Sequence, residues 1–258
     1  MSDVSPLLNI LNKSLRLSGK KLIRDFDEIE KLQSSLKQTE KFVNISLSGL
    51  EKEIIEVLNK VKPNLKIEKT HHIVDEDCWI IDLKDCKSNF ERAVDDFCFN
   101  VSLKEDNKIL CCVLYNPIND ENFYFQKGNG GFKNNYRIRV SEKKRIKESR
   151  FSFFSNPNEL KNSLLISEIR NLFKKEQIET RESGSIYSDV SLLSSGKIDC
   201  LIFSSNNRSQ IDIINLILLE TGGFLTEFSL SGVFFYIASN KYIGKIAKEM
   251  IENKYENQ

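Results

Sequence analysis

The segment between Asp96 and Val140 constrains the fold most, because short apolar runs alternate there with turn residues. Aromatic and branched aliphatic residues in runs of this length are typical of β-strands, and short turns favour antiparallel neighbours. Strands are expected at 98–103, 109–115 and 122–126. The chain is therefore predicted to contain an antiparallel meander.

The pattern changes after about residue 146, where strand-like and helix-like segments alternate. Such alternation is typical of α/β layers. Strands are expected at 151–154, 177–180, 200–203 and 233–238, and helices at 163–173, 185–195, 211–220 and from Lys241 onward. We predict an N-terminal α+β half over 1–145 and a C-terminal α/β half over 146–258, together forming one compact unit.

Helices are also predicted before the meander. Apolar residues recur at helical spacing from Pro6 to Glu30. A second helix is expected from about Leu50 to Val61, where Pro63 ends it, and a short strand over 65–70.

The charge balance argues against one class of function. Lys and Arg number 38 against 37 for Asp and Glu, a net charge of +1, whereas a nucleic-acid-binding domain is normally strongly basic. No apolar run approaches the roughly 20 residues of a membrane-spanning helix, and the N-terminus has no signal-peptide pattern. We therefore expect a soluble, cytoplasmic protein that binds neither membranes nor nucleic acid strongly.

The cysteines show no zinc-ribbon spacing, and most lie in apolar, strand-like segments. Reduced and buried thiols are therefore expected. Cys86 is the one cysteine in a polar turn, so it has the best chance of a chemical role. The six are Cys78, Cys86, Cys98, Cys111, Cys112 and Cys200.

Two carboxylates follow the apolar run 79–81, at Asp82 and Asp85. The run is typical of the end of a buried strand. Two acidic groups held this close repel each other unless a cation or a proton separates them. Mg²⁺ is commonly bound by one or two carboxylates together with substrate phosphate oxygens. The pattern therefore indicates a phosphate-handling metal site, and the alternative is a solvated acidic turn.

The stretch from Cys78 to Phe90, C-W-I-I-D-L-K-D-C-K-S-N-F, resembles the inositol monophosphatase signature W-I-I-D-P-hydrophobic-D-G-T-x-N-F. The resemblance extends to V-L-Y-N-P at 113–117, G-N-G-G-F at 128–132 and R-E-S-G-S-I-Y-S-D at 181–189. It covers nearly the whole chain and implies a layered αβαβα sandwich with α+β and α/β parts. A glycine cluster such as 128–131 can cradle phosphate, but in this family it is a structural turn.

The resemblance also implies an activity and partners. The family hydrolyses inositol monophosphate or a related phosphorylated polyol or sugar with Mg²⁺, commonly as a homodimer. Bacterial relatives include proteins that act in transcription through protein contacts, so a protein partner is a further expectation.

Site residues follow from the same resemblance. Glu68 takes the place of a metal-binding, catalytic Glu. His71 and His72 follow in a polar loop, but adjacent side chains point apart, so a metal shared between them is not expected. The remaining assignments are Asp82, Asp85 and the Lys84 carbonyl as metal ligands, and Gly184 and Ser185 at a helix N-terminus facing an anionic substrate.

Three acidic positions of the family are lost here. Leu47 replaces an Asp that reaches the metal site, Phe203 replaces the sugar-binding Glu, and Gln210 replaces the Asp of the second metal. Asp212 lies two residues further along, about 200° around a helix, so it points away unless the helix start shifts.

Lys87 stands where the family has the Thr that positions the attacking water. An ammonium there is expected to neutralise Asp82 and Glu68 in place of a metal ion. The alternative is that Lys87 turns outward to solvent, as most lysines do.

These departures bear directly on activity. Two-metal phosphoryl chemistry needs one ion to activate water and another to stabilise the leaving oxygen. We therefore expect the phosphatase activity to be weakened or lost. The alternatives are a one-metal phosphatase with a changed substrate and a non-catalytic protein-binding role.

Overall fold

The computed structural model describes residues 6–32, 36–69, 76–156 and 158–255. The loop that holds His71 and His72 lies outside the described residues. Within them, every helix is too short or too polar to cross a membrane.

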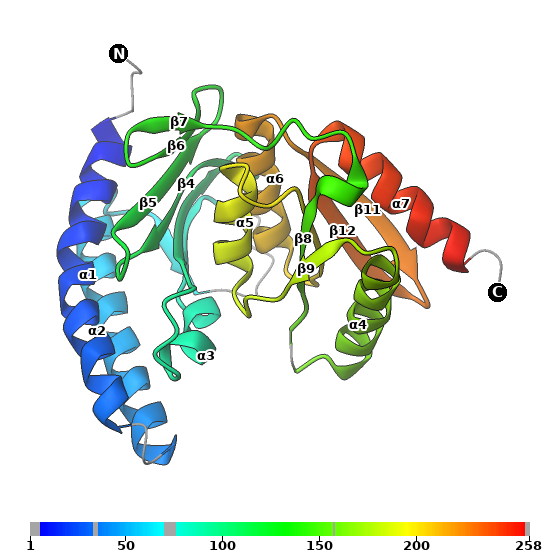
Figure 1. Ribbon diagram of the computed structural model, residues 1–258. Helices are drawn as coiled ribbons and strands as arrows, with labels where there is room; N and C mark the ends of the chain where they lie inside the picture. The colour runs from blue at the N-terminus through cyan, green and yellow to red at the C-terminus, as the bar shows by residue number, and fades with distance from the viewer. Residues whose placement is uncertain (1–5, 33–35, 70–75, 157, 256–258) are drawn as a thin grey trace.

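Two long helices form the first layer. They are α1 (Pro6–Leu32) and α2 (Leu36–Val61), which pack side by side (Figure 1). The expected start of the second helix near Leu50 is wrong, because α2 begins 14 residues earlier. Val43, Leu50 and Ile54 are buried at helical spacing on the side of α2 that faces the core, so the amphipathic pattern starts before Gly49 and that glycine does not interrupt it.

The second layer is a seven-stranded sheet in which the strands follow one another in sequence order. Only the first pair, β1 and β2, is parallel. The predicted antiparallel meander is thus confirmed over β3 to β7. The strands are β1 (Lys66–Glu68), β2 (Cys78–Asp82), β3 (Phe99–Glu105), β4 (Lys108–Asn116), β5 (Glu121–Gln126), β6 (Gly130–Lys133) and β7 (Tyr136–Ile138).

Short helices follow β2 and precede the second sheet. They are η1 (Lys84–Cys86), α3 (Lys87–Phe90) and η2 (Ile146–Glu148). The predicted division near residue 145 falls in the connection over 139–149. We propose that the two halves form one structural unit, because α6 of the second half packs on the first sheet.

The C-terminal half alternates strands and helices as predicted. Its sheet has the order β11-β12-β10-β8-β9. A strand at 224–230 was not predicted. The elements are β8 (Arg150–Phe154), α4 (Leu160–Lys175), β9 (Glu179–Arg181), α5 (Ile186–Ser194), β10 (Cys200–Ser204), α6 (Arg208–Thr221), β11 (Phe224–Leu230), β12 (Val233–Ser239) and α7 (Lys241–Tyr255).

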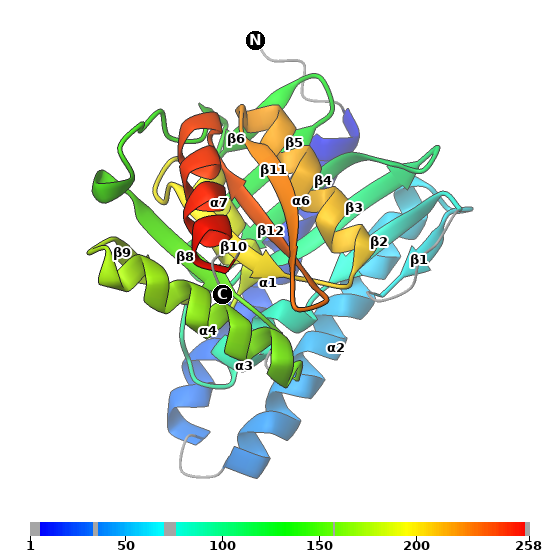
Figure 2. The same ribbon diagram turned by 90° about the vertical axis from the view of Figure 1, so that its right-hand side faces the viewer.

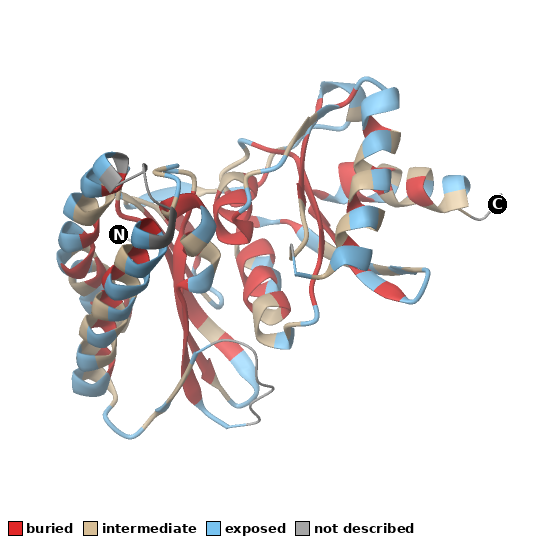
Figure 3. Cartoon of the chain, turned by 90° about the horizontal axis from the view of Figure 1, so that it is seen from below, coloured by how far each residue is buried: buried red, intermediate tan, exposed pale blue. Residues whose placement is uncertain are grey.

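The helices and sheets stack in five layers, which confirms the αβαβα sandwich. In Figure 1, α1 and α2 cover one side of the first sheet, α5 and α6 lie between the sheets, and α4 and α7 cover the far side. Figure 2 shows α4 and α7 on the outer face of the second sheet. Three apolar clusters fill the spaces between layers, and Figure 3 shows the buried residues concentrated on the strands and inner helix faces.

The alternation of β2 decides where the acidic turn lies. Trp79 and Ile81 pack toward α1 and α2, whereas Cys78 and Ile80 pack toward the middle layer. Because strand side chains alternate between faces, Asp82 continues the face of Ile80. The strand therefore delivers this carboxylate toward α5 and α6.

All six cysteines are buried and free, as predicted. Cys86 is completely buried, and burial raises the pKa of its thiol well above the usual value. A thiol kept protonated in this way is a poor nucleophile, so the chemical role considered for Cys86 finds no support.

Candidate functional site

Asp82 ends β2, as predicted, and is buried. Its Oδ1 accepts the backbone N–H of Lys84 at 3.1 Å, and its Oδ2 accepts the hydroxyl of Tyr187 at 3.3 Å. Burial, followed by the charge of Asp82, raises the pKa of Tyr187 well above its usual value. The phenol therefore stays protonated and donates to Asp82.

Asp85 lies against the N-terminus of α5. Its Oδ1 accepts the N–H of Ile186 at 2.9 Å, and its Oδ2 accepts the N–H of Tyr187 at 3.1 Å and the hydroxyl of Ser185. The first N–H groups of a helix have no partner within the helix, so an external acceptor satisfies them. Asp85 is thus a capping group for α5.

The environment of Asp85 favours its neutral form. Burial, then the nearby charge of Asp82, raises the pKa of Asp85 to about 7, although hydrogen bonds from Ser185, Ile186 and Tyr187 act in the opposite direction. The repulsion predicted between the two carboxylates is therefore present.

Glu68 ends β1, which lies parallel to β2 with Glu68 opposite Ile80. Its carboxylate pairs with Lys66 at 2.9 Å. The strand positions predicted for Glu68 and Asp82 are confirmed, but Glu68 has its cationic partner on its own strand.

Lys87 does not have the partners expected of it. Its ammonium lies 3.2 Å from Glu40 on α2 and 3.5 Å from Glu91. The expectation that it neutralises Asp82 and Glu68 is corrected, because Lys87 opens α3 and the helix directs its side chain toward α2.

Gly184 and Ser185 were expected to face a substrate. Ser185 is completely buried, and its hydroxyl donates to Asp85 and accepts the N–H of Ser188 at 3.2 Å. Gly184 has a φ of +79°, and a Cβ there would lie 3.3 Å from the Asn89 side chain. Substrate contact by these two residues stays a prediction, and their visible role is to shape the start of α5.

The three lost acidic positions have structural roles here. Leu47 lies on α2 and packs against the apolar cluster beside the first sheet. Phe203 is completely buried, and its ring stacks on Tyr236 at 5.2 Å. The side-chain carbonyl of Gln210 accepts the hydroxyl of Ser205 at 2.8 Å.

Asp212 pairs with Arg208 at 3.1 Å, one turn earlier on α6. It also lines a groove between α6 and the β3–β4 turn, together with Asn107 and Asn215. The N-terminus of α6 is fixed by Asn207, whose side chain accepts the N–H of Gln210. The start of α6 is therefore in the register that turns the Asp212 side chain away from the predicted metal site.

The glycine turn at 128–131 is a structural turn, as the resemblance implied. Its N–H groups at Gly128 and Gly130 donate to the Glu220 carboxylate, each at 2.7 Å. The donors that a phosphate would need are already bound to α6.

Sequence reasoning missed three residues of this region. Tyr187 holds Asp82, and Asn89 donates to the carbonyls of Asp96 and Ser183, which joins α3 to the segment before α5. Asp189 is a buried carboxylate that accepts the hydroxyl of Ser183 at 2.7 Å. All three lie within matched motifs, but spacing along the chain carries no signal for contacts between distant elements.

The residues present do not fit a site for two Mg²⁺ ions. Both oxygens of Asp85 accept N–H groups, Glu68 is paired with Lys66, and position 210 offers an amide that is already bonded to Ser205. Among the described residues, no three His, Cys, Asp or Glu side chains are grouped so as to bind a metal ion.

Comparison with known proteins agrees with this fold. The sequence profile of the inositol monophosphatase family matches residues 3–256. The chain belongs to the inositol monophosphatase family. It is 28% identical over 260 residues to an inositol-1-monophosphatase of Rhizobium meliloti, with 96% of this chain and 97% of that protein covered. It is also 26% identical over 259 residues to the Nus factor SuhB of Haemophilus influenzae, with 96% and 95% covered.

Solved structures of the family have the same fold. The extragenic suppressor protein suhB of Bartonella henselae gives a TM-score of 0.77 at 24% identity, covering 96% of this chain and 99% of that one. An inositol monophosphatase from Anabaena gives 0.76 at 20% identity, covering 96% and 95%. Relatives named as phosphatases and relatives named as Nus factors thus have about the same sequence identity to this chain.

Proposed function

We propose that this member of the inositol monophosphatase family has a weakened or lost Mg²⁺-dependent phosphatase activity. The observation that carries the proposal is Gln210. Where the family has an acidic ligand for its second ion, this chain has a neutral amide that is bonded to Ser205. Without that charge, no second cation stabilises the leaving oxygen.

The remaining residues stabilise the site by themselves. Tyr187 holds Asp82, and the α5 N-terminus holds Asp85. A proton on Asp85 relieves the repulsion between the two carboxylates, so the pair does not require a metal ion to remain close together.

The alternative is a one-metal phosphatase with a changed substrate, which we expect to be a phosphorylated polyol or sugar. Glu68, Asp82, Asp85 and the Lys84 carbonyl are the groups that we propose would bind its ion. The Lys87 ammonium would act there only if it left Glu40 and Glu91.

The test is an assay of phosphate release from inositol monophosphate and from an aryl phosphate with Mg²⁺ present. We expect the wild type to release phosphate far more slowly than an active phosphatase used as the positive control, at a rate close to those of Asp82→Asn and a buffer blank. Turnover by the wild type at a rate similar to that of the active phosphatase, abolished by Asp82→Asn, would overturn the proposal and support the one-metal alternative.

A second candidate function is a non-catalytic role in binding another protein. It is favoured by the similarity to several proteins named Nus factor SuhB. The family's homodimer also stays a prediction, and sedimentation of the purified protein would test it.

A further inference from the structure

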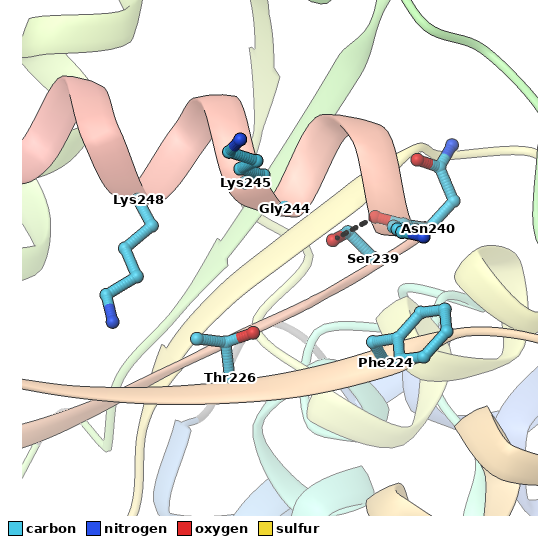
Figure 4. A pocket seen from close by; sticks show the side chains of 8 residues that line it. Phe224, Thr226, Ser239, Asn240, Gly244, Lys245 and Lys248 are labelled. Atoms are coloured by element: carbon cyan, nitrogen blue, oxygen red, sulfur yellow. Dashed lines mark hydrogen bonds between the residues drawn. The ribbon is translucent and has the colours of Figure 1, made fainter.

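A groove lies between the edge strand β11 and helix α7. Its volume is about 410 Å³. Phe224 and Thr226 line it from β11, and Lys241, Lys245 and Lys248 line it from α7. Figure 4 shows Lys248 extending from the helix toward β11, with Phe224 and Thr226 on the strand below.

The groove exists because α7 packs away from the sheet edge. The buried side chains of α7, Ile243, Ala247 and Ile251, belong to an apolar cluster that includes residues of β8, β10 and β12. From β11, only the partly buried Phe228 and Leu230 pack against this cluster. Their side of the helix covers those strands and leaves β11 only partly covered, so Phe224 is 53% exposed.

The backbone of β11 is unpaired on one side. Within the described residues, β11 pairs only with β12 and forms the edge of the second sheet. An edge strand presents free N–H and C=O groups, which can bind another extended chain as an added strand. Its seven residues contain no lysine and no proline, two residue types that often protect such edges.

The groove is also positively charged. Among the described residues, Lys245 pairs with Glu249 at 3.8 Å and Lys248 pairs with Glu252 at 3.5 Å, and both ion pairs are at least partly exposed. Exposed pairs of this kind contribute little. Lys241 makes no ion pair in the part of the chain that the structure describes.

The spacing of these lysines suits a strand. Lys241 and Lys245 are separated by about 6 Å along the helix axis. Alternate side chains of an extended chain are separated by about 6.6 Å. Acidic residues at alternate positions of an added strand would therefore come opposite successive lysines.

We propose that this groove binds an extended, acidic segment of another protein, which pairs with β11 and directs acidic side chains toward Lys241, Lys245 and Lys248. The proposal does not depend on whether the chain hydrolyses phosphate. A single-stranded nucleic acid would also be attracted by the lysines, but it offers no N–H and C=O ladder to the edge of β11.

The test is fluorescence anisotropy with a short labelled peptide in which Glu alternates with Thr. We expect it to bind, and the same peptide with Gln in place of Glu to bind about tenfold more weakly. Two further Glu peptides carry N-methyl groups, one on the odd-numbered amides and the other on the even-numbered amides. These two sets of amides point to opposite edges of an extended peptide, so only one of the two peptides loses the hydrogen bonds to β11. We expect that peptide to lose binding although its charge is unchanged.

A triple variant of the α7 lysines tests whether the peptide binds at this groove. Lys241→Gln, Lys245→Gln and Lys248→Gln together should weaken binding about tenfold. The matched control is Lys13→Gln, Lys20→Gln and Lys52→Gln on α1 and α2, which removes the same charge from the opposite layer and should leave binding unchanged.

Four results would overturn the proposal. These are no binding of the Glu peptide, equal binding of both N-methylated peptides, equal loss in both triple variants, and tighter binding of a labelled oligonucleotide at the same groove. Sedimentation of the free protein is a further check. A dimer dissociated only by the α7 variant would mean that a second copy occupies the groove, and this result would also overturn the proposal.

Discussion

At the residue scale, burial determines which acidic side chains are charged. Asp189 is completely buried on α5 near Arg181 and Asp96. Burial raises its pKa to about 7, and the hydrogen bond from Ser183 and the charge of Arg181 only partly oppose this. Because an Asp in the unfolded chain has a pKa near 3.9, the folded protein binds a proton that the unfolded chain releases.

We therefore predict that Asp189 lowers stability as the pH rises from about 4 to about 7, since the folded state binds more protons than the unfolded state in this window. Asp189→Asn removes this dependence. Relative to the wild type, the loss of unfolding free energy between pH 5 and pH 8 should shrink by roughly 2 kcal/mol. Urea unfolding at the two pH values measures this difference in unfolding free energy. An identical change in stability with pH for the wild type and the variant would contradict the prediction.

Lys87 gives a second prediction at this scale. Its ion pairs with Glu40 and Glu91 are partly exposed, so Lys87→Thr should cost no more than about 1 kcal/mol. Mg²⁺ binding measured by calorimetry should not change. Tighter Mg²⁺ binding by the variant would restore the idea that Lys87 occupies a cation position, and Glu40→Gln is the control that removes one partner alone.

At the scale of elements, the N-terminus of α5 depends on Asp85, which lies 100 positions before the N-cap residue of that helix. Ser185 is the N-cap, but Asp85, from the turn after β2, accepts the N–H groups of Ile186 and Tyr187. The contact joins the first sheet to the helix layer in the middle of the molecule.

We predict that Asp85→Ala destabilises the protein by on the order of 3 kcal/mol, since it leaves buried N–H donors without an acceptor. Asp85→Asn should cost much less, because its amide oxygen still accepts one donor and the repulsion with Asp82 is removed. Chemical unfolding without metal compares the two. Asp27→Ala, at an exposed position of α1, should change stability by no more than about 0.5 kcal/mol. Equal stability of the Ala and Asn variants would contradict the capping role.

At the scale of the whole molecule, the middle layer packs directly on the first sheet where α6 meets β6. A Cβ at Gly131 would lie 2.6 Å from the Thr221 methyl and 2.7 Å from the Phe125 ring. Thr221 is buried on α6. The distance between the middle layer and the first sheet is therefore set by the absence of a side chain at residue 131.

Gly131→Ala should thus destabilise the protein by ~1–3 kcal/mol through overpacking. Gly49→Ala is the matched control. Its Cβ would meet only the flexible end of Lys21 at 3.4 Å, and alanine in place of glycine within a helix should stabilise by up to about 1 kcal/mol. Thermal unfolding of both variants gives the comparison, and a Gly131→Ala variant as stable as the wild type would show that the layers can move apart.

The sequence alone determined the meander, the alternation of the C-terminal half and the place of Asp82 at a strand end, because periodicity and turn residues act over a few neighbouring positions. It did not determine the start of α2 or the strand β11. The pattern of β11 is weak because an edge strand is only half covered, and each of its residues is exposed or intermediate in burial.

Only the tertiary structure decided the partners of the charged side chains. Lys87 pairs with Glu40, 47 residues before it, and Asp85 binds the start of α5, about 100 residues after it. Which carboxylate meets a lysine, a tyrosine or a helix N-terminus depends on the packing of layers that are distant in sequence. The sequence could name the acids of this site, but only the packing of the five layers shows what neutralises each of them.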